Sequence, residues 1–309
     1  MNIKDAVQLG AGFGNLDFLA KQVVEGFISG MHKSPFHGFS AEFAEHKVYN
    51  QGESTRHIDW KLYAKTDKLY TKRYDDETNL RCHFILDNSS SMHYPILKKQ
   101  SLDTYNKIGF SALAIASLMN LLKKQRDAVG LSVYNNHYDY YVPEKGSERH
   151  HAMLLNQLDV AIQNPENSIG TDTYAILHQI AEKLHKRSMV VLFSDMFQTS
   201  SDSDKLFEAL QHLKHNKHEV ILFHTLDYET EMEFDFESKP QRFIDVETGK
   251  YMDLYAENAK DAYKEAMFMF TDQLKAQCAQ YRIHYVPVNI QEMFHPVLTR
   301  FLVQRQKFG

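Results

Sequence analysis

From about residue 80 to the end of the chain, short apolar runs alternate with longer segments that have helical periodicity. Three of the runs are typical of buried strands: residues 82–87, 188–195 and 219–226. Residues 283–288 predict a further strand. Alternation of this kind predicts an α/β fold with a mostly parallel central sheet and helices on both faces.

The intervening segments predict the helices that cover this sheet. They are residues 101–124, 148–162, 172–186, 204–215, 258–281 and 295–305. Residues 129–135 and 138–143 have the pattern of a strand pair, and residues 233–254 predict a small β excursion that interrupts the alternation.

The first 79 residues have a different pattern, with one helical segment at residues 15–31 followed by a mixture of short strands and turns. A segment this small and polar has little apolar surface with which to fold alone. We therefore expect two domains: an N-terminal α+β accessory segment at residues 1–79, packed on a main α/β domain at residues 80–309.

Composition narrows the possible functions and locations. The net charge of −5 gives no overall basic field for nucleic acid or an anionic membrane. Cys82 and Cys278 lie far apart in the sequence, which favours free thiols in a reducing compartment. The first fifteen residues lack a long apolar segment, and residues 108–122 are too short to span a bilayer. We expect a cytoplasmic protein without membrane insertion.

Oxygen-bearing side chains gather where the predicted strands end. Asp87 ends the first buried run and is followed by Ser89 and Ser91, while Asp195 ends the second run and Thr171 precedes a predicted helix. In an open α/β sheet, ligands bind beyond the carboxyl ends of the strands. Hydroxyl and carboxylate oxygens suit a small hard cation, so we expect Asp87, Ser89, Ser91, Thr171 and Asp195 to bind Mg²⁺ or Mn²⁺.

These five residues resemble the metal-ion-dependent adhesion site of the Rossmann-like von Willebrand factor A domain, which begins with the same D-x-S-x-S spacing. Met196 follows Asp195, where many such domains have glycine. The N-terminal segment resembles the bacterial family called domain of unknown function 58, which commonly has a G-D-x-x-R-x-I-D-W core. This chain has Glu53 in place of the Asp and keeps Gly52, Arg56, Ile58, Asp59 and Trp60.

The resemblance implies a bacterial protein that binds partners and is not an enzyme. It implies that a Glu or Asp of a protein partner supplies the last ligand of the metal. Members of the family are often encoded beside MoxR-type AAA+ ATPases and are thought to act with them in chaperone-like maturation or assembly of other complexes.

Other interpretations of the same residues stay open. The alternative function is a metal-dependent hydrolase or phosphotransferase that uses Asp87, although position 89 is serine where a second Asp is expected. Asp87 and the serines also suit a simple turn cap. We expect Trp60 to be a buried anchor of the accessory segment. The basic patch at residues 98–107 is expected to be ordinary surface.

Overall fold

The computed structural model describes most of the chain. The described residues are 15–31, 43–48, 58–74, 80–97, 104–135, 140–163, 173–197, 203–215, 217–245 and 250–308. Internal contacts divide the chain into a larger unit, Met1–Phe27 with Leu80–Gly309, and a smaller unit, Ile28–Asn79.

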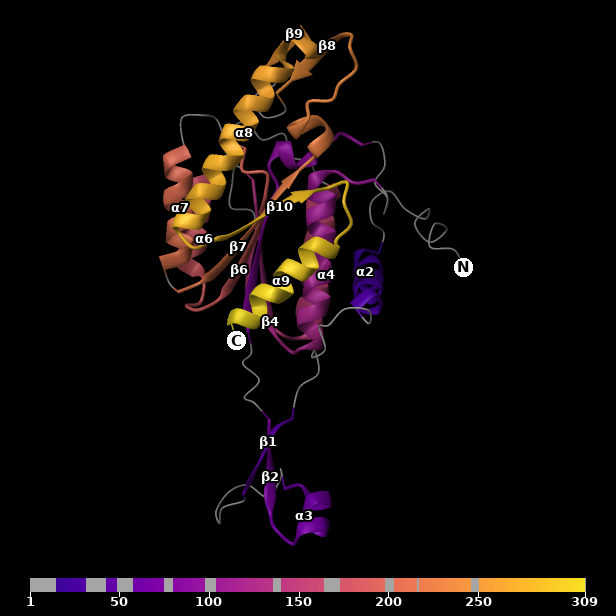
Figure 1. Ribbon diagram of the computed structural model, residues 1–309, viewed down its shortest axis with the longest axis vertical. Helices are drawn as coiled ribbons and strands as arrows, with labels where there is room; N and C mark the ends of the chain where they lie inside the picture. Colours follow the sequence, from indigo (N-terminus) through magenta and orange to yellow (C-terminus); the bar gives the residue numbers. More distant parts are fainter. Residues whose placement is uncertain are drawn as a thin grey trace, which may run out of the picture. The chain divides into compact units, whose positions relative to one another are not determined.

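The larger unit is built on a six-stranded sheet with the strand order β10-β7-β6-β3-β4-β5 (Figure 1). Its strands are β3 (Arg81–Asp87), β4 (Ala128–Tyr134), β5 (Tyr140–Lys145), β6 (Met189–Ser194), β7 (Glu219–Leu226) and β10 (His284–Asn289). All neighbouring pairs are parallel except β4 and β5. The mostly parallel sheet, its three buried strands, the further strand β10 and the strand pair predicted from the sequence are confirmed; the pair is antiparallel.

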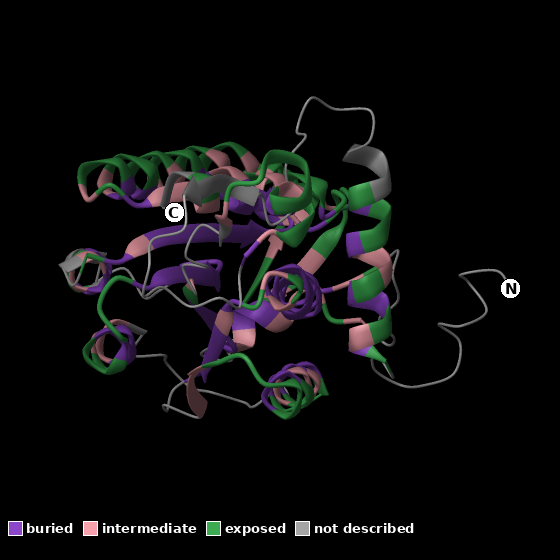
Figure 2. Cartoon of the chain, turned by 90° about the horizontal axis from the view of Figure 1, so that it is seen from below, coloured by how far each residue is buried: buried purple, intermediate pink, exposed green. Residues whose placement is uncertain are grey.

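Helices cover both faces of this sheet, as the sequence predicted. They are α2 (Leu16–Met31), α4 (Lys107–Lys124), α5 (Glu148–Gln163), α6 (Thr173–Lys183), α7 (Ser203–His215), α8 (Ala256–Gln280) and α9 (His295–Phe308). One apolar cluster joins the sheet to α6, α7 and the C-terminal half of α8. On the other face, the ring of Phe84 on β3 stacks on Phe301 of α9. Figure 2 shows the buried residues concentrated in the strands and in α4.

The burial of α4 on nearly all sides follows from its sequence and its position. Every residue from Lys107 to Leu122 is buried, because the helix packs against the sheet, α5 and α9. On α2, Asp17 accepts a hydrogen bond from Asn120 of α4, and Phe27 contacts His295 at the start of α9. Among the described helices, none combines the length and the apolar character that crossing a membrane requires.

The predicted β excursion is a hairpin that leads into α8. After β7 the chain forms a π-helical turn, η4 (Tyr228–Met232), then pairs β8 (Pro240–Ile244) with β9 (Tyr251–Tyr255) in antiparallel register. Phe234, Phe236 and Phe243 pack on one another, and Phe234 also packs on Tyr263 of α8. These aromatic contacts fasten the hairpin to the helix that follows it.

The strand order reverses between β3 and β6. The chain passes from β3 to its neighbour β4 and the edge strand β5, then returns to the other side of β3 as β6. The carboxyl ends of β3 and β6 therefore lie side by side and diverge into separate loops. A reversal of this kind is where open α/β sheets bind ligands.

The smaller unit pairs β1 (Phe43–Val48) with β2 (Tyr70–Tyr74) and contains the short helix α3 (Trp60–Thr66). Asp59 caps α3 by accepting hydrogen bonds from the backbone N–H groups of Lys61 and Leu62. Trp60 is 61% exposed, so it is not buried within the smaller unit, and its role as an anchor on the main domain stays a prediction. Arg56 lies outside the described residues.

The smaller unit ends at Asn79, where the boundary was expected, but it begins at Ile28 and not at residue 1. Residues 16–27 of α2 belong to the larger unit, so the smaller unit begins within that helix. The reason is visible in the pattern of α2, whose buried residues Leu16, Leu19, Ala20, Val24 and Phe27 form an apolar stripe. The packing of the accessory segment on the main domain stays a prediction.

Candidate metal centre

The end of β3 brings Asp87, Ser89 and Ser91 together. Asp87 is the last residue of the strand, and its Oδ1 accepts a hydrogen bond of 2.9 Å from the backbone N–H of Ser89. The hydroxyl oxygens of Ser89 and Ser91 lie 3.1 Å apart, and all three side chains are buried. The turn capping expected of Asp87 is therefore real, but Ser89 makes no side-chain capping bond to the short 3₁₀ helix η3 (Ser90–His93). The serine hydroxyls remain oriented toward each other.

The end of β6 joins this cluster through Ser194. Its hydroxyl donates a hydrogen bond of 2.5 Å to Oδ2 of Asp87. The next residue, Asp195, is completely buried, and its Oδ1 accepts from the backbone N–H of Phe197 at 3.1 Å. Met196 has a φ of 55°, in the left-handed region that favours glycine.

The two acids share one desolvated space. Burial and, to a smaller extent, the negative charge of Asp195 raise the pKa of Asp87 to about 6, against the lowering effect of the hydrogen bonds from Ser194 and Ser89. Each buried carboxylate disfavours the charged form of the other. A divalent cation bound nearby would stabilise both charged forms and lower both pKa values.

A buried lysine, which the sequence interpretation missed, neutralises part of this charge. Lys107 begins α4, and its Nζ donates a hydrogen bond of 2.8 Å to Oδ2 of Asp195 and another to Glu231 of η4. Burial acts to lower the pKa of Lys107, but the charges of Asp195 and Glu231 outweigh it, and the pKa is raised. The ammonium also lies 5.0 Å from the ring centroid of Phe197.

Lys107 corrects the expectation that residues 98–107 form ordinary surface, because its side chain is 0% exposed. The sequence contains a pattern that could have predicted the burial of Lys107. Lys107 directly precedes the apolar run 108–122, and a helix that is apolar on most sides buries its first turn as well. Asn106 caps this turn by accepting a hydrogen bond from the backbone N–H of Gly109 at 3.0 Å. The cap fixes the position of the lysine near the carboxyl ends of the central strands.

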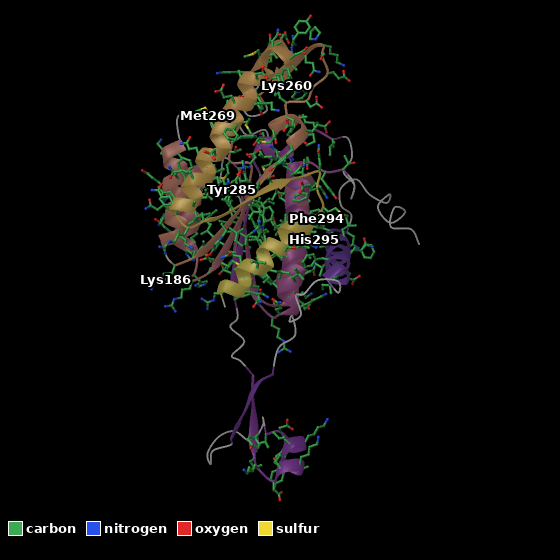
Figure 3. All side chains as sticks on the ribbon, viewed as in Figure 1. Lys186, Lys260, Met269, Tyr285, Phe294 and His295 are labelled. Carbon is green, nitrogen blue, oxygen red and sulfur yellow. The ribbon has the colours of Figure 1, made fainter. Side chains whose placement is uncertain are left out.

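Neighbouring strands hold the site in place and bring a buried hydroxyl to it. The Nε2 of His224 on β7 lies 2.8 Å from the backbone oxygen of Asp195, and its Nδ1 lies 2.7 Å from the hydroxyl of Tyr285 on β10, a residue labelled in Figure 3. Burial lowers the pKa of His224 to about 4, so the ring is neutral at pH 7. Among the described residues, the buried hydroxyl of Tyr134, which ends β4 beside Asp87, has no hydrogen-bond partner of good geometry. A buried hydroxyl in this position is suited to a further polar group.

Four of the five predicted ligands lie at the adjacent ends of β3 and β6: Asp87, Ser89, Ser91 and Asp195. Thr171 lies outside the described residues. Within the described part of the chain, no three His, Cys, Asp or Glu side chains are arranged to hold a metal ion. The candidate donor set consists instead of two carboxylates and serine hydroxyls, which fits a hard cation that keeps several water ligands.

Comparison with known proteins identifies the family. The family described as "Protein of unknown function DUF58" matches residues 45–270, and this chain belongs to it. Uncharacterised proteins of Mycobacterium tuberculosis (Rv1480) and Mycobacterium bovis (Mb1516) are each 22% identical over 191 residues. That stretch covers 62% of this chain and 58% of each relative, so the chain spans little more than half the length of the curated relatives it matches.

Solved structures with a similar chain path include the hypothetical protein BatB of Bacteroides thetaiotaomicron, at 14% identity and a TM-score of 0.45. Another is an aerotolerance-related membrane protein of Bacteroides fragilis, at 13% identity and a TM-score of 0.47. Each covers 74% of this chain, and the match spans 98% and 99% of the respective solved chains. A third, at 14% identity and a TM-score of 0.23, is described as a membrane-spanning protein of Vibrio fischeri; it covers 74% of this chain, and the match spans 98% of the solved chain. Two of these three proteins are described as membrane proteins. We do not keep the expectation of a purely cytoplasmic location.

Proposed function

We propose that this member of the DUF58 family is a metal-dependent protein-interaction module whose larger unit is a von Willebrand factor A-like domain. The observation that supports the proposal most is the buried pair Asp87 and Asp195 at the switch point of the sheet. They end adjacent strands, and Ser194 links one strand to the acid of the other. Buried acids at this place need a counter-charge that a ligand can supply.

In this proposal Asp87, Ser89 and Ser91 hold Mg²⁺ or Mn²⁺ together with Thr171 and Asp195, directly or through water. Serine hydroxyls are neutral, so the first shell carries little negative charge and the cation keeps a strong attraction for anions. The bound metal supplies an electrophilic centre with an open position. A Glu or Asp of a partner protein fills that position, and the chain's own residues hold the metal and orient it toward the partner.

The proposed partner is a MoxR-type AAA+ ATPase or one of its clients, and the proposed role is accessory, in chaperone-like maturation or assembly. The support for this partner is the family membership and the resemblance described above. The module itself catalyses no reaction in this proposal, because binding requires only that the metal shell be completed by the partner's carboxylate.

A hydrolase or phosphotransferase that uses Asp87 is the alternative, and Lys107 is the observation in its favour. Phosphoryl transfer needs a cation near the developing charge. Lys107, however, donates to Asp195 and Glu231 rather than standing beside Asp87, and Asp87 accepts hydrogen bonds from Ser89 and Ser194 on its two oxygens. A phosphatase and esterase screen with Mg²⁺ and Mn²⁺ tests this alternative, and turnover that disappears in Asp87→Asn would establish it.

The interaction proposal is tested by affinity purification from the native host and by a pull-down with the MoxR-type ATPase, each with EDTA or with Mg²⁺. We expect association with the parent in Mg²⁺, loss in EDTA, and loss in Asp195→Ala that added Mg²⁺ does not restore. Asp272→Asn, on the exposed side of α8, is the matched control and should bind as the parent does.

On the partner, one Glu or Asp changed to its amide should reproduce the loss. Circular dichroism must show that each variant is folded. Association that persists in EDTA and in Asp195→Ala would place the partner elsewhere on the molecule and contradict the proposal.

A further inference from the structure

Both carboxylate oxygens of Asp195 have protein partners. Oδ1 accepts from the backbone N–H of Phe197, and Oδ2 accepts from Nζ of Lys107 at 2.8 Å. The backbone contact is part of the turn after β6 and stays with the fold. The lysine contact occupies the oxygen that a metal ion, or a water bound to it, would otherwise use.

Lys107 has a second acceptor within reach. Its Nζ also donates to Oε1 of Glu231, and Oε2 of the same carboxylate accepts from the backbone N–H of Asp227 at 2.8 Å. Glu231 is therefore held in place by its own turn, independently of Asp195. A buried ammonium must keep an anionic partner, and Glu231 can remain that partner when Asp195 turns away.

We propose that Lys107 is a built-in cation that competes with the metal ion for Asp195, and that Glu231 retains the lysine when the metal binds. This inference rests on the proposed function, because it concerns the same metal centre. It assigns to Lys107 a role that lowers metal affinity, whereas a lysine that only positions Asp195 would raise it. The two roles therefore predict opposite effects when the charge is removed.

The charges of the cluster explain why the lysine and the metal ion compete for Asp195. Asp87, Asp195 and Glu231 carry three potential negative charges, and Lys107 supplies one positive charge. Without a metal, the lysine prevents Asp195 from standing unpaired in a desolvated space. With a metal, the lysine becomes a like charge beside the cation and repels it. A centre built in this way binds its metal weakly until a partner's carboxylate adds a further negative charge.

The competition also connects the metal centre to a neighbouring part of the fold. Glu231 belongs to η4, and the residues that follow it contact α8 through the ion pair of Glu233 with Lys264 and the packing of Phe234 on Tyr263. A shift of Lys107 toward Glu231 changes the charge environment of this turn. Metal binding would therefore alter the charge environment at the start of the β8–β9 hairpin.

The test is a calorimetric titration of Mn²⁺ into the metal-free full chain, its Lys107→Gln and Lys107→Met variants, and Asp87→Ala. Glutamine keeps a hydrogen-bond donor and removes the charge, while methionine keeps the apolar stem. We expect both lysine variants to bind Mn²⁺ about tenfold more tightly than the parent, because a nearby positive charge is gone. Lys214→Met, which breaks a 2.8 Å ion pair with Glu219 at the opposite end of β7, should bind as the parent does.

Thermal melting gives a second readout for variants that fold poorly. Removing the lysine leaves buried carboxylates unpaired, so the melting temperature of each variant should fall without metal and recover with Mn²⁺ by more than the parent gains. Recovery of fold by Mn²⁺ in Lys107→Met supports the proposal even if the metal-free variant is unfolded.

The outcomes separate this inference from the proposed function. In one outcome, the parent binds Mn²⁺, Asp87→Ala does not, and both lysine variants bind more weakly than the parent or equally well. That outcome would overturn the competition and leave the metal centre intact. Binding by the lysine variants alone would support the competition in its strongest form. If neither the parent nor the lysine variants bind Mn²⁺, and metal restores no fold, both the competition and the metal centre are overturned.

Discussion

Two buried polar clusters lie four residues apart on β3, one around His83 and one around Asp87. In the first, the ring nitrogens of His83 lie 2.7 Å from Ser132 Oγ and 2.7 Å from Glu144 Oε1. Hydroxyl, imidazole and carboxylate are the groups of an acyl-transfer triad. Yet the side chains of His83 and Glu144 are fully buried, Ser132 is completely buried too, and the ring stacks on Tyr141. This cluster is mid-sheet and closed, and its role is structural.

The Asp87 cluster differs in charge and in position. The His83 cluster pairs one carboxylate with one imidazole, whereas the Asp87 cluster holds three carboxylates against a single lysine. It also lies at the carboxyl ends of neighbouring strands, where open α/β sheets bind ligands. The comparison shows that a suitable set of side chains does not by itself make a binding site. The cluster must also carry excess charge that a ligand can neutralise, and it must lie where ligands bind in such a fold.

The largest expected effect tests the structural role of the first cluster. His83→Ala leaves the buried Glu144 and Ser132 without their shared partner, and should lower the free energy of unfolding by about 3–5 kcal/mol. Urea unfolding measures this. The affinity for Mn²⁺ should stay that of the parent, and a lost metal site in a folded His83→Ala chain would show that the two clusters act as one.

Gly130 offers a smaller perturbation of the same cluster. A Cβ at this position would lie 2.5 Å from Nδ1 of His83 and 2.9 Å from the backbone oxygen of Val142. Gly130→Ala should therefore force the imidazole away from Glu144 and cost about 1–3 kcal/mol of stability. A variant as stable as the parent in urea would mean that the cluster is looser than its distances indicate.

The pH dependence of metal binding sharpens the electrostatic side of the comparison. Asp87 has its pKa raised to about 6, mainly by burial, and it must lose its proton to hold a metal. Below pH 6 the affinity for Mn²⁺ should fall by about tenfold per pH unit through this group. Titrations at pH 5, 6 and 7 measure the effect, and equal affinities at pH 5 and pH 7 would contradict the assignment of Asp87.

The raised pKa of Asp87 also makes the stability of the fold depend on pH. Because its pKa is higher in the folded chain than the ordinary 3.8, the folded state binds the proton more tightly than the unfolded state. The metal-free fold therefore loses stability through Asp87 as the pH rises from about 4 to above 6. Saturating Mn²⁺ should abolish this loss, since the metal compensates the charge.

The smallest expected effect concerns the separate, smaller unit. Trp60 is exposed and contacts Tyr63 edge-on at 6.2 Å between ring centroids. Trp60→Ala should change the free energy of unfolding by less than about 0.5 kcal/mol and leave both clusters unaffected. A loss of several kcal/mol in the melting of the full chain would support the expectation that Trp60 anchors the accessory segment.

Local patterns in the sequence predicted the strands and helices of the larger unit well, and they placed Asp87 and Asp195 at the ends of strands. The structure shows that these two strands are neighbours. These features depend on periodicity and on parallel topology, which the chain displays directly. The start of α4 was less accurate. The helix begins at Lys107, because Asn106 caps it there, six residues after the start of the helical pattern at residue 101.

Features that depend on residues distant in sequence were not predicted. Lys107 and Glu231 meet across 124 positions, and neither belongs to the D-x-S-x-S motif that attracted attention to the site. A large aromatic residue is usually buried, but Trp60 occupies the first position of a short helix that has no buried residues of its own. Tertiary packing decides both cases, and local pattern does not report it.

The central claim is that the Asp87 cluster is a metal centre. Its most direct test is calorimetric titration of Mn²⁺ into the metal-free parent and into Asp87→Ala at pH 7, with circular dichroism to confirm that both are folded. The account predicts one site in the parent and none in Asp87→Ala. Identical binding isotherms for the two folded proteins would contradict it.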